Sequence, residues 1–329
     1  MGALKLSSSP EKWELKEPFT ISRGSRTHVD LLYVEITDGV YTGRGETSPT
    51  SRYGESIESE TKKIETLASK ITDDLTPTSL QFLMPNGGAR NAVDAALWDY
   101  LAKKTGKPVW EMLGLTAPKP IETVYTISLN TPEKMAASAK KNAFRGLLKL
   151  KFGGDDDDRR ASLIREAVGP ECRIVLDANE AWTVEHLKDY LPVMADNNIL
   201  MVEQPMPQGQ DEALGEVEHI VPICADESCH TTSDLKHLKG LYEMVNIKLD
   251  KTGGLTEAAH LFHKAKAMDF EIMVGCMLGT SLGMAASHLV ASHAKFVDLD
   301  APLLIKKDRV PGLRYDGNLV YPPQRIFWG

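Results

Sequence analysis

Three carboxylates stand at the ends of three consecutive apolar segments of the chain. Asp177 ends "RIVLD", Glu203 ends "ILMVE" and Asp226 follows "VPICA". Carboxylates brought together in this way repel one another strongly unless a cation lies between them. Mg²⁺ prefers all-oxygen ligands with open positions, whereas zinc sites usually include histidine or cysteine, and no histidine accompanies these residues. The pattern therefore predicts a magnesium site formed by the three carboxylates.

Lysines end the apolar segments on both sides of these carboxylates. Lys149 and Lys151 lie in "LLKLKF", and Lys248 ends "MVNIK". A lysine is a poor base at its ordinary pKa of about 10.4, but a neighbouring cation or metal lowers that pKa. Two such bases on opposite sides of one metal site predict a reaction that removes a proton from one face of a carbon and returns it on the other.

Polar residues at the ends of the apolar segments recur at a nearly regular interval along the chain. From Lys151 through Asp177, Glu203, Asp226, Lys248 and Cys276 to Asp298, the intervals are 26, 26, 23, 22, 28 and 22 residues. An interval in the twenties fits one strand, one loop and one helix, so we expect βα units. Eight such units close into a (β/α)8 barrel, an α/β fold with its active site at the carboxyl ends of the strands. The eight segments are "IETVYTISLN", "LLKLKFGG", "RIVLDANEAW", "ILMVEQPMP", "VPICADESCH", "MVNIKLDKTGG", "FEIMVGCMLGT" and "KFVDLDAP".

The amino-terminal third of the chain follows a different pattern. "HVDLLYVEITDGVYTGRGE" alternates around an Asp-Gly turn, which is typical of a β-hairpin, and two helical segments follow it. We therefore expect an α+β capping domain over residues 1–115 and a barrel domain over residues 116–300. Residues 301–329 contain a second Asp-Gly hairpin, in "LRYDGNLVY", and we expect this segment to return to the capping domain.

Composition limits the classes of function. The 329 residues carry a formal net charge of −8, which disfavours nucleic-acid binding because that needs a basic face. The four cysteines include no C-x-x-C pair, which favours a reducing compartment over a disulfide framework. No apolar run approaches the ~18 residues of a membrane span, and the N-terminus lacks the apolar core of a signal peptide. We expect a cytoplasmic enzyme without nucleic-acid or membrane partners that could form a homo-oligomer.

The motifs resemble those of the enolase superfamily, specifically its muconate-lactonizing subgroup. The shared pattern is "KLK" in the second βα unit, Asp, Glu and Asp in the third to fifth, and Lys in the sixth. "ICADESCH", "NIKLDKTGG" and "DLDAP" further resemble the dipeptide epimerases, above all those of the L-Ala-D/L-Glu type. The resemblance covers essentially the whole chain and implies an enolase-like barrel whose capping domain is completed by the C-terminal tail.

The resemblance also implies a role for each matching residue. Asp177, Glu203 and Asp226 would hold Mg²⁺, and Lys151 and Lys248 would be the acid/base pair. The expected reaction is a 1,1-proton transfer at the Cα of the C-terminal residue of a dipeptide, through an ene-diolate that the metal stabilises. The other positions expected to contact the substrate are Lys149, at the metal-bound carboxylate, and Thr126, Cys276 and Leu278.

Two further groups of charged residues could recognise the ends of a dipeptide. Asp298 and Asp300 alternate in "DLDAP", so both side chains face one side of the last strand, and no cation lies beside them in the sequence. We expect them to bind the substrate ammonium. Arg23 and Arg26 in "ISRGSRT", together with Arg52, are cations that could pair with an acidic substrate side chain.

Other functions remain open on the sequence alone. The same lysines could serve an N-acyl amino acid racemase or an o-succinylbenzoate synthase. From a different class, Lys248 could form a Schiff base, as in barrel aldolases, although that chemistry needs no three-carboxylate metal site. A binding protein without catalysis is the third alternative, and the presence of both lysines and all three carboxylates disfavours it.

Overall fold

Eight parallel strands form a closed barrel in the computed structural model, which describes residues 3–329. The strands follow one another around the sheet in chain order, as expected for βα units joined by crossovers. The two edges meet where the backbone N–H of Val124 donates to the carbonyl of Val297 at 2.8 Å. The predicted fold class is therefore confirmed. The strands are β5 (Tyr125–Ile127), β6 (Leu147–Lys151), β7 (Arg173–Asp177), β8 (Ile199–Glu203), β9 (Ile223–Ala225), β10 (Met244–Lys248), β11 (Glu271–Gly275) and β12 (Phe296–Val297).

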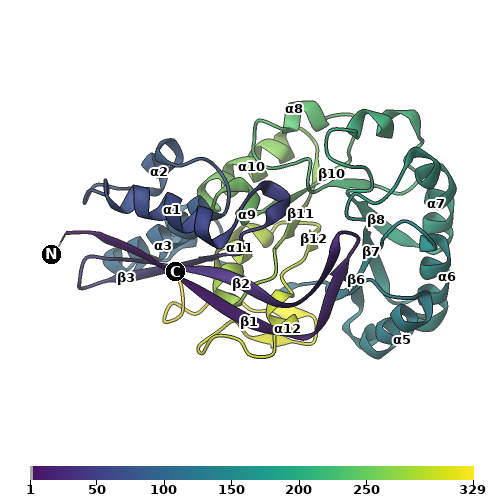
Figure 1. Ribbon diagram of the computed structural model, residues 1–329, viewed down its shortest axis with the longest axis horizontal. Coiled ribbons are helices and arrows are strands. Elements are labelled where there is room, and N and C mark those ends of the chain that lie inside the picture. The colour runs from purple at the N-terminus through teal and green to yellow at the C-terminus, as the bar shows by residue number, and fades with distance from the viewer. Residues whose placement is uncertain (1–2) are drawn as a thin grey trace.

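Helices surround the barrel on its outer face (Figure 1). The first of them, α5, begins after Thr131, whose hydroxyl accepts a hydrogen bond from the Lys134 N–H. We had expected a regular helix after every strand, but this is not the case after β8 and β9. A 3₁₀ helix, η3 (Asp211–Glu216), follows β8, because prolines and a glycine in "PMPQG" interrupt helical hydrogen bonding, and only the four-residue α8 (Leu235–Leu238) follows β9. The remaining helices are α5 (Pro132–Asn142), η2 (Ala143–Arg145), α6 (Asp157–Val168), α7 (Val184–Asp196), α9 (Leu249–Thr252), α10 (Leu255–Ala267), α11 (Ser281–Ala291) and α12 (Ala301–Leu304).

The interior of the barrel is layered because the side chains of each strand alternate between its two faces. Near the amino-terminal ends, one apolar residue from each βα unit closes the interior. Residues two positions later point to the same side, and several of these are charged: Lys149 follows Leu147, and Asp177 follows Val175. The alternation of the sequence therefore places a layer of charged side chains above a layer of apolar ones, which we call the floor. The floor consists of Val124, Leu147, Val175, Met201, Cys224, Met244, Met273 and Phe296.

An antiparallel sheet and three main helices form the capping domain. The predicted hairpin corresponds to β2 and β3, while the long β1, which the sequence did not predict, pairs with β2. Glycine at position 45 lets α3 pack directly on β3, because a Cβ there would lie 2.0 Å from the carbonyl oxygen of Ala92. The β1–β2 hairpin reaches across the barrel (Figure 1). The elements are β1 (Lys5–Ile21), β2 (Gly24–Thr37), β3 (Thr42–Thr47), η1 (Ser51–Tyr53), α1 (Ile57–Ala68), α2 (Pro77–Leu83), α3 (Gly88–Thr105) and α4 (Val109–Met112).

The C-terminal tail contacts both parts of the molecule. Its predicted hairpin, β13 (Tyr315–Asp316) and β14 (Leu319–Val320), pairs with β4 (Ile121–Glu122) at the start of the barrel. The last residue then reaches the capping domain, where the Gly329 N–H donates to Asp99 at 2.9 Å. The domain boundaries at residues 115 and 300 stay a prediction. Within residues 3–329, none of the helices has both the length and the apolar character needed to cross a membrane.

Candidate active site

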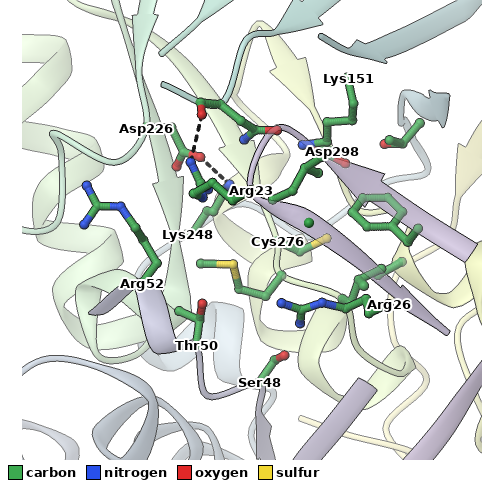
Figure 2. Close-up of a pocket in the computed structure, with 18 of the residues that line it drawn as sticks. Arg23, Arg26, Ser48, Thr50, Arg52, Lys151, Asp226, Lys248, Cys276 and Asp298 are labelled. Atoms are coloured by element: carbon green, nitrogen blue, oxygen red, sulfur yellow. Dashed lines mark hydrogen bonds and ion pairs between the residues drawn. The ribbon is translucent and has the colours of Figure 1, made fainter. Parts of the chain in front are cut away.

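A cavity of about 380 Å³ lies at the carboxyl ends of the barrel strands and beneath the capping domain. The barrel contributes Lys151, Lys248 and Asp298 to its wall, and the capping domain contributes Arg23 and Arg26 (Figure 2). A volume of this order suits a small ligand that is largely enclosed. The cavity therefore brings together residues that the sequence separates by more than two hundred positions.

The three carboxylates at the ends of neighbouring strands converge beside this cavity. Asp177 and Glu203 are register partners on β7 and β8, and Asp226 follows β9. Each offers an oxygen atom that lies within 4.8 Å of the others, and all three side chains are buried. Oε2 of Glu203 is buried, and its protein partner is the ammonium group of Lys149 at 2.6 Å. A buried, converging set of carboxylate oxygens fits a hard divalent cation such as Mg²⁺.

Lysine ammonium groups pair with these carboxylates. Nζ of Lys151 lies 2.6 Å from Asp177, and Nζ of Lys248 lies 2.5 Å from Asp226. Burial opposes ionisation of Asp177, but the charges of Lys151 and Lys149 outweigh it and lower its pKa to about 2. Burial and the charge of Asp177 raise the pKa of Glu203 to about 7. Negative charge is therefore least well compensated at Glu203, in the middle of the three.

The two predicted catalytic lysines stand on opposite sides of the barrel. Lys151 ends β6 and Lys248 ends β10, which lie four strands apart in a closed sheet of eight. A glycine on the neighbouring strand leaves room for the second lysine, since a Cβ at Gly275 would lie 3.0 Å from Cε of Lys248. Burial lowers the pKa of Lys248, but the charges of Asp226 and Glu203 outweigh this effect and raise it. Both ammonium groups face one cavity from opposite directions.

Lys149 lies deeper than the other two lysines and contradicts one expectation. Asp298 was expected to lack a protein cation, but Nζ of Lys149 lies 2.7 Å from its carboxylate. The same ammonium lies 2.6 Å from Glu203 and 3.4 Å from Asp177. Lys149 is fully buried and does not line the cavity, so its contact with a substrate carboxylate stays a prediction. The Lys149 side chain therefore links Asp177 and Glu203 to Asp298 on the opposite wall of the barrel.

The wall opposite the three carboxylates carries the remaining predicted residues. Asp300 accepts a hydrogen bond from the backbone N–H of Thr126 at 2.6 Å, which ties β5 to the end of β12. Burial and the charge of Asp298 raise the pKa of Asp300 to about 7. Cys276 and Leu278, which follow β11, line the cavity beside them. All of the predicted substrate positions on the barrel, apart from Lys149, therefore face the cavity.

The arginines of the capping domain differ in how far they are already paired. Arg23 forms ion pairs with Glu180 and Glu227 at 2.9 and 2.7 Å, and Arg52 pairs with Glu180 at 2.6 Å. Arg26 also lines the cavity, is exposed, and forms no ion pair with a carboxylate of residues 3–329. Two of the three arginines are therefore already held by barrel carboxylates, and binding of a substrate side chain by any of them stays a prediction.

Comparison with known families and proteins agrees with this geometry. Residues 4–114 match the N-terminal domain of the mandelate racemase/muconate lactonizing enzyme family, and residues 132–322 match the enolase C-terminal domain-like family. The chain belongs to the enolase superfamily. Within the superfamily, it is 43% identical over 307 residues to the L-Ala-D/L-Glu epimerase of Escherichia coli K12, covering 93% of this chain and 95% of that protein. It is also 41% identical over 301 residues to an N-acetyl-D-glutamate racemase of Pseudoalteromonas, covering 91% and 95%.

Solved structures of the superfamily include close matches over the whole chain. An Agrobacterium tumefaciens enolase family member with homology to dipeptide epimerases, bound to sodium and L-Ala-L-Glu, superimposes with a TM-score of 0.97. It is 50% identical and covers 99% of this chain and 100% of its own. A dipeptide epimerase of Enterococcus faecalis complexed with Mg and L-Leu-L-Tyr gives a TM-score of 0.90 at 30% identity, covering 98% of both chains.

Two residues of this site were not identified as site residues from the sequence. Lys251 is fully buried and donates to Oδ1 of Asp226 at 2.6 Å and to the carbonyl of Asn246 at 3.0 Å. The side chain of Asn246 donates to Oε1 of Glu203 at 2.7 Å. Strand alternation could have identified Asn246, which precedes Lys248 by two residues. A lone lysine in a short helix carries no such signal, because most lysines are solvated.

Proposed function

We propose that the chain is a magnesium-dependent dipeptide epimerase, an isomerase that inverts the Cα of the C-terminal residue of a dipeptide. The observation that carries the proposal is the position of Lys151 and Lys248 on opposite sides of one cavity, with the three carboxylates on the strands between them. Membership of the enolase superfamily supports the proposal, as do the names of the E. coli relative and of the two liganded structures.

Each lysine would serve one enantiomer as the base. The uncharged amine of Lys151 would take the Cα proton from one face, while the ammonium group of Lys248 would deliver a proton to the other face. In the reverse direction the two roles exchange, so that substrate and product differ only in configuration at Cα. Ion pairs with Asp177 and Asp226 hold the two nitrogen atoms towards the centre of the barrel mouth.

The buried carboxylates and lysines would prepare the site for a developing negative charge. Asp177, Glu203 and Asp226 would hold Mg²⁺, as their oxygen-only donor set suggests. When bound, Mg²⁺ supplies positive charge to the substrate carboxylate and stabilises the negative charge that develops as Cα loses its proton. Lys149 and Lys251 would keep positive charge beside Glu203 and Asp226, which fixes the orientation of these carboxylates.

Asp300 is the residue that we assign to the substrate ammonium. Asp298 already pairs with Lys149, whereas no cation of residues 3–329 lies within ion-pair distance of Asp300. An ammonium group at this position would supply the missing positive charge and form a charge-assisted hydrogen bond, typically about 1.5–3 kcal/mol. A free dipeptide carries such a group a few bonds from the reacting Cα, whereas an N-acyl amino acid carries none.

The proposal is tested by comparing L-Ala-L-Glu with N-acetyl-L-Glu, because the Pseudoalteromonas relative is named for the second kind of substrate. We expect kcat/KM for the free dipeptide to exceed that for the N-acetyl compound by at least about 10-fold, which corresponds to one charged hydrogen bond. The variant Asp300→Asn should narrow this difference by slowing the dipeptide. A wild-type preference for N-acetyl-L-Glu would replace the dipeptide assignment with the racemase alternative.

Arg26 would determine the preference for an acidic substrate side chain, because it is the unpaired arginine of the cavity wall within the described residues. Changing Arg26→Met should raise KM for L-Ala-L-Glu by about 10-fold, since a carboxylate enclosed without a cation is unfavourable. KM for L-Ala-L-Ala should stay unchanged. Steady-state kinetics on the two substrates measure both values.

The matched control for this change is Arg159→Met, which removes an exposed arginine of α6 that pairs with Glu133 on the surface. This variant should behave as wild type on both substrates. An equal rise in KM for the acidic and the neutral dipeptide in the Arg26 variant would remove Arg26 from specificity.

Two expectations about the cellular setting belong to this proposal. All four cysteines are free thiols, which supports a reducing compartment such as the cytoplasm. A small-molecule substrate accounts for the enclosed cavity without a nucleic-acid or membrane partner. Assembly into a homo-oligomer stays a prediction.

A further inference from the structure

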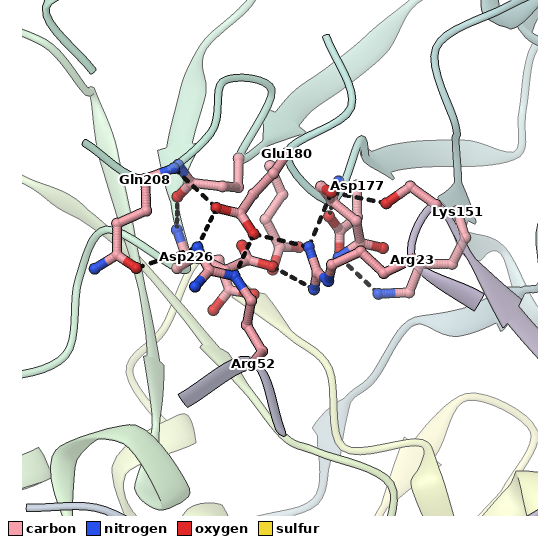
Figure 3. A network of polar contacts seen from close by, with 12 residues as sticks. Arg23, Arg52, Lys151, Asp177, Glu180, Gln208 and Asp226 are labelled. Atoms are coloured by element: carbon pink, nitrogen blue, oxygen red, sulfur yellow. Dashed lines mark hydrogen bonds and ion pairs between the residues drawn. The ribbon is translucent and has the colours of Figure 1, made fainter. Parts of the chain in front are cut away.

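Glu180 in the loop after β7 is the point at which two segments of the capping domain meet the barrel. Its side chain is only 8% exposed. Arg52 donates to both of its oxygens, from Nε to Oε2 at 2.7 Å and from Nη2 to Oε1 at 2.6 Å. Arg23 donates to Oε2 at 2.9 Å, and the backbone N–H of Gln208 donates to Oε1 at 2.8 Å (Figure 3). One carboxylate thus accepts hydrogen bonds from two guanidinium groups.

Arg23 extends the same network to a second barrel loop. Its Nη2 donates to Glu227 at 2.7 Å, and its Nη1 also donates to the carbonyl of Asn179 at 2.9 Å. The hydroxyl of Ser22 donates to that carbonyl at 2.8 Å. The β1–β2 turn is therefore bound to the loops after β7 and β9, whereas Arg52 binds the η1 segment to the first of these loops.

The backbone around Glu180 is held in an unusual conformation. Asn179 and Glu180 have φ values of 46° and 66°, in the left-handed region that residues with a Cβ seldom adopt. Hydrogen bonds from the Asn179 N–H to Asp177 at 2.9 Å and from the Glu180 N–H to the Gln204 carbonyl at 2.8 Å stabilise this turn. Strained backbone of this kind is common where a side chain must point in one direction for function.

The same contacts distinguish Arg23 and Arg52 from Arg26. Glu180 and Glu227 compensate the charges of Arg23 and Arg52, and both arginines line the mouth of the cavity. Their guanidinium groups are about one-third exposed, at 35% and 33%, so water can reach the contacts from outside. Salt should therefore weaken them. Arg26 alone among the three is left to meet a ligand.

We propose that Glu180 is a positioning residue that holds the β1–β2 turn and the η1 segment closed over the cavity. The structural part of this inference concerns the capping segments themselves, and only its effect on KM rests on the proposed function. When Glu180 loses its charge, the two segments should open more often. A ligand then binds only to the closed fraction, so its apparent affinity falls in proportion to that fraction.

Limited trypsin digestion tests the structural part without any substrate, because trypsin cleaves after arginine. Cleavage after Arg23 and Arg52, followed by mass spectrometry, should be about 10-fold faster in Glu180→Gln than in wild type, since proteolysis follows the population of the open form. The matched control is Glu133→Gln, which breaks an exposed Glu–Arg ion pair between α5 and α6 that involves neither Arg23 nor Arg52. This variant should be cleaved at the wild-type rate.

Kinetics separate a positioning role from a merely structural one. In Glu180→Gln, KM should rise about 10-fold for L-Ala-L-Glu and for L-Ala-L-Ala alike, with kcat reduced by less than about 3-fold. Arg52→Met should raise KM in the same way but by less, because it removes only one of the two guanidinium groups that pair with Glu180. The double variant should be no worse than Glu180→Gln alone, because both changes act on this one carboxylate. Unchanged melting temperatures in all variants confirm that the fold is intact.

The outcomes distinguish this inference from the proposed function. Unchanged cleavage at both Arg23 and Arg52 in Glu180→Gln overturns the positioning role, whatever substrate the enzyme uses. A loss of kcat with KM unchanged in the single variants also overturns it. Faster cleavage in a protein that turns over no dipeptide supports the positioning role and contradicts the proposed function instead.

Discussion

Replacing Lys151 or Lys248 by alanine is expected to abolish epimerisation while each variant still exchanges the Cα proton of one enantiomer. The loss in rate should be about 10²–10⁴-fold, the usual contribution of a positioned acid or base. Lys151→Ala retains the base on the β10 side, and Lys248→Ala retains the base on the β6 side. The two variants should therefore exchange opposite enantiomers of Ala-Glu with deuterium from the solvent.

Proton NMR in D₂O measures this exchange separately for L-Ala-L-Glu and L-Ala-D-Glu. The control is Lys188→Ala, which removes an exposed lysine of α7 and should leave epimerisation unchanged. Exchange of the same enantiomer by both active-site variants would contradict the arrangement of one base on each side.

Removal of Mg²⁺ is expected to abolish activity and leave the protein folded. Chelation should reduce turnover to background, and added Mg²⁺ should restore it. The fold should persist because Lys149, Lys151 and Lys248 pair with the carboxylates of the site in the absence of metal. Circular dichroism should therefore stay constant on chelation, and Mg²⁺ should raise the melting temperature because it binds the folded state.

Glu203→Gln tests the same site through one ligand. The change keeps the shape of the side chain and removes the charge that is least well compensated, so Mg²⁺ affinity should fall by at least about 10-fold. Isothermal titration measures the affinity independently of turnover. The control, Glu166→Gln, alters an exposed residue of α6 and should bind Mg²⁺ as wild type does. Full activity in metal-free wild-type protein would contradict the magnesium site.

The barrel and the centre of its site could be predicted because both follow from local periodicity. Strand side chains repeat every second residue, so an apolar residue such as Val175 on the floor places Asp177 above it on the same side. The same rule places Lys149 and Lys151 inside the barrel. Chain order then makes neighbours of consecutive strands, which brings the three carboxylates together.

Contacts across the barrel could not be predicted in the same way. Lys149 and Asp298 lie 149 positions apart in the chain, and only closure of the sheet brings their side chains to 2.7 Å. The pairing of Arg23 and Arg52 with Glu180 depends on how the capping domain sits on the barrel. No local pattern encodes either distance.

Strand β1 was not predicted for a different reason. Its residues include "SSSPEKWELKEP", and most of their side chains are exposed, so the alternation of apolar residues that indicates a strand is absent. Pairing with β2 along most of its length holds this segment in place instead. Sequence reasoning is weakest where a strand buries little of its own surface.

The most direct test of the two-base account follows deuterium in the first turnovers of wild-type enzyme. L-Ala-L-Glu is incubated in D₂O with Mg²⁺, and the small amount of L-Ala-D-Glu formed early is analysed by mass spectrometry. The account predicts deuterium at Cα in essentially all of this product, because the lysine that delivers the proton has already exchanged with solvent. Product that retains the original proton would show that a single base returns it, and would contradict transfer between Lys151 and Lys248.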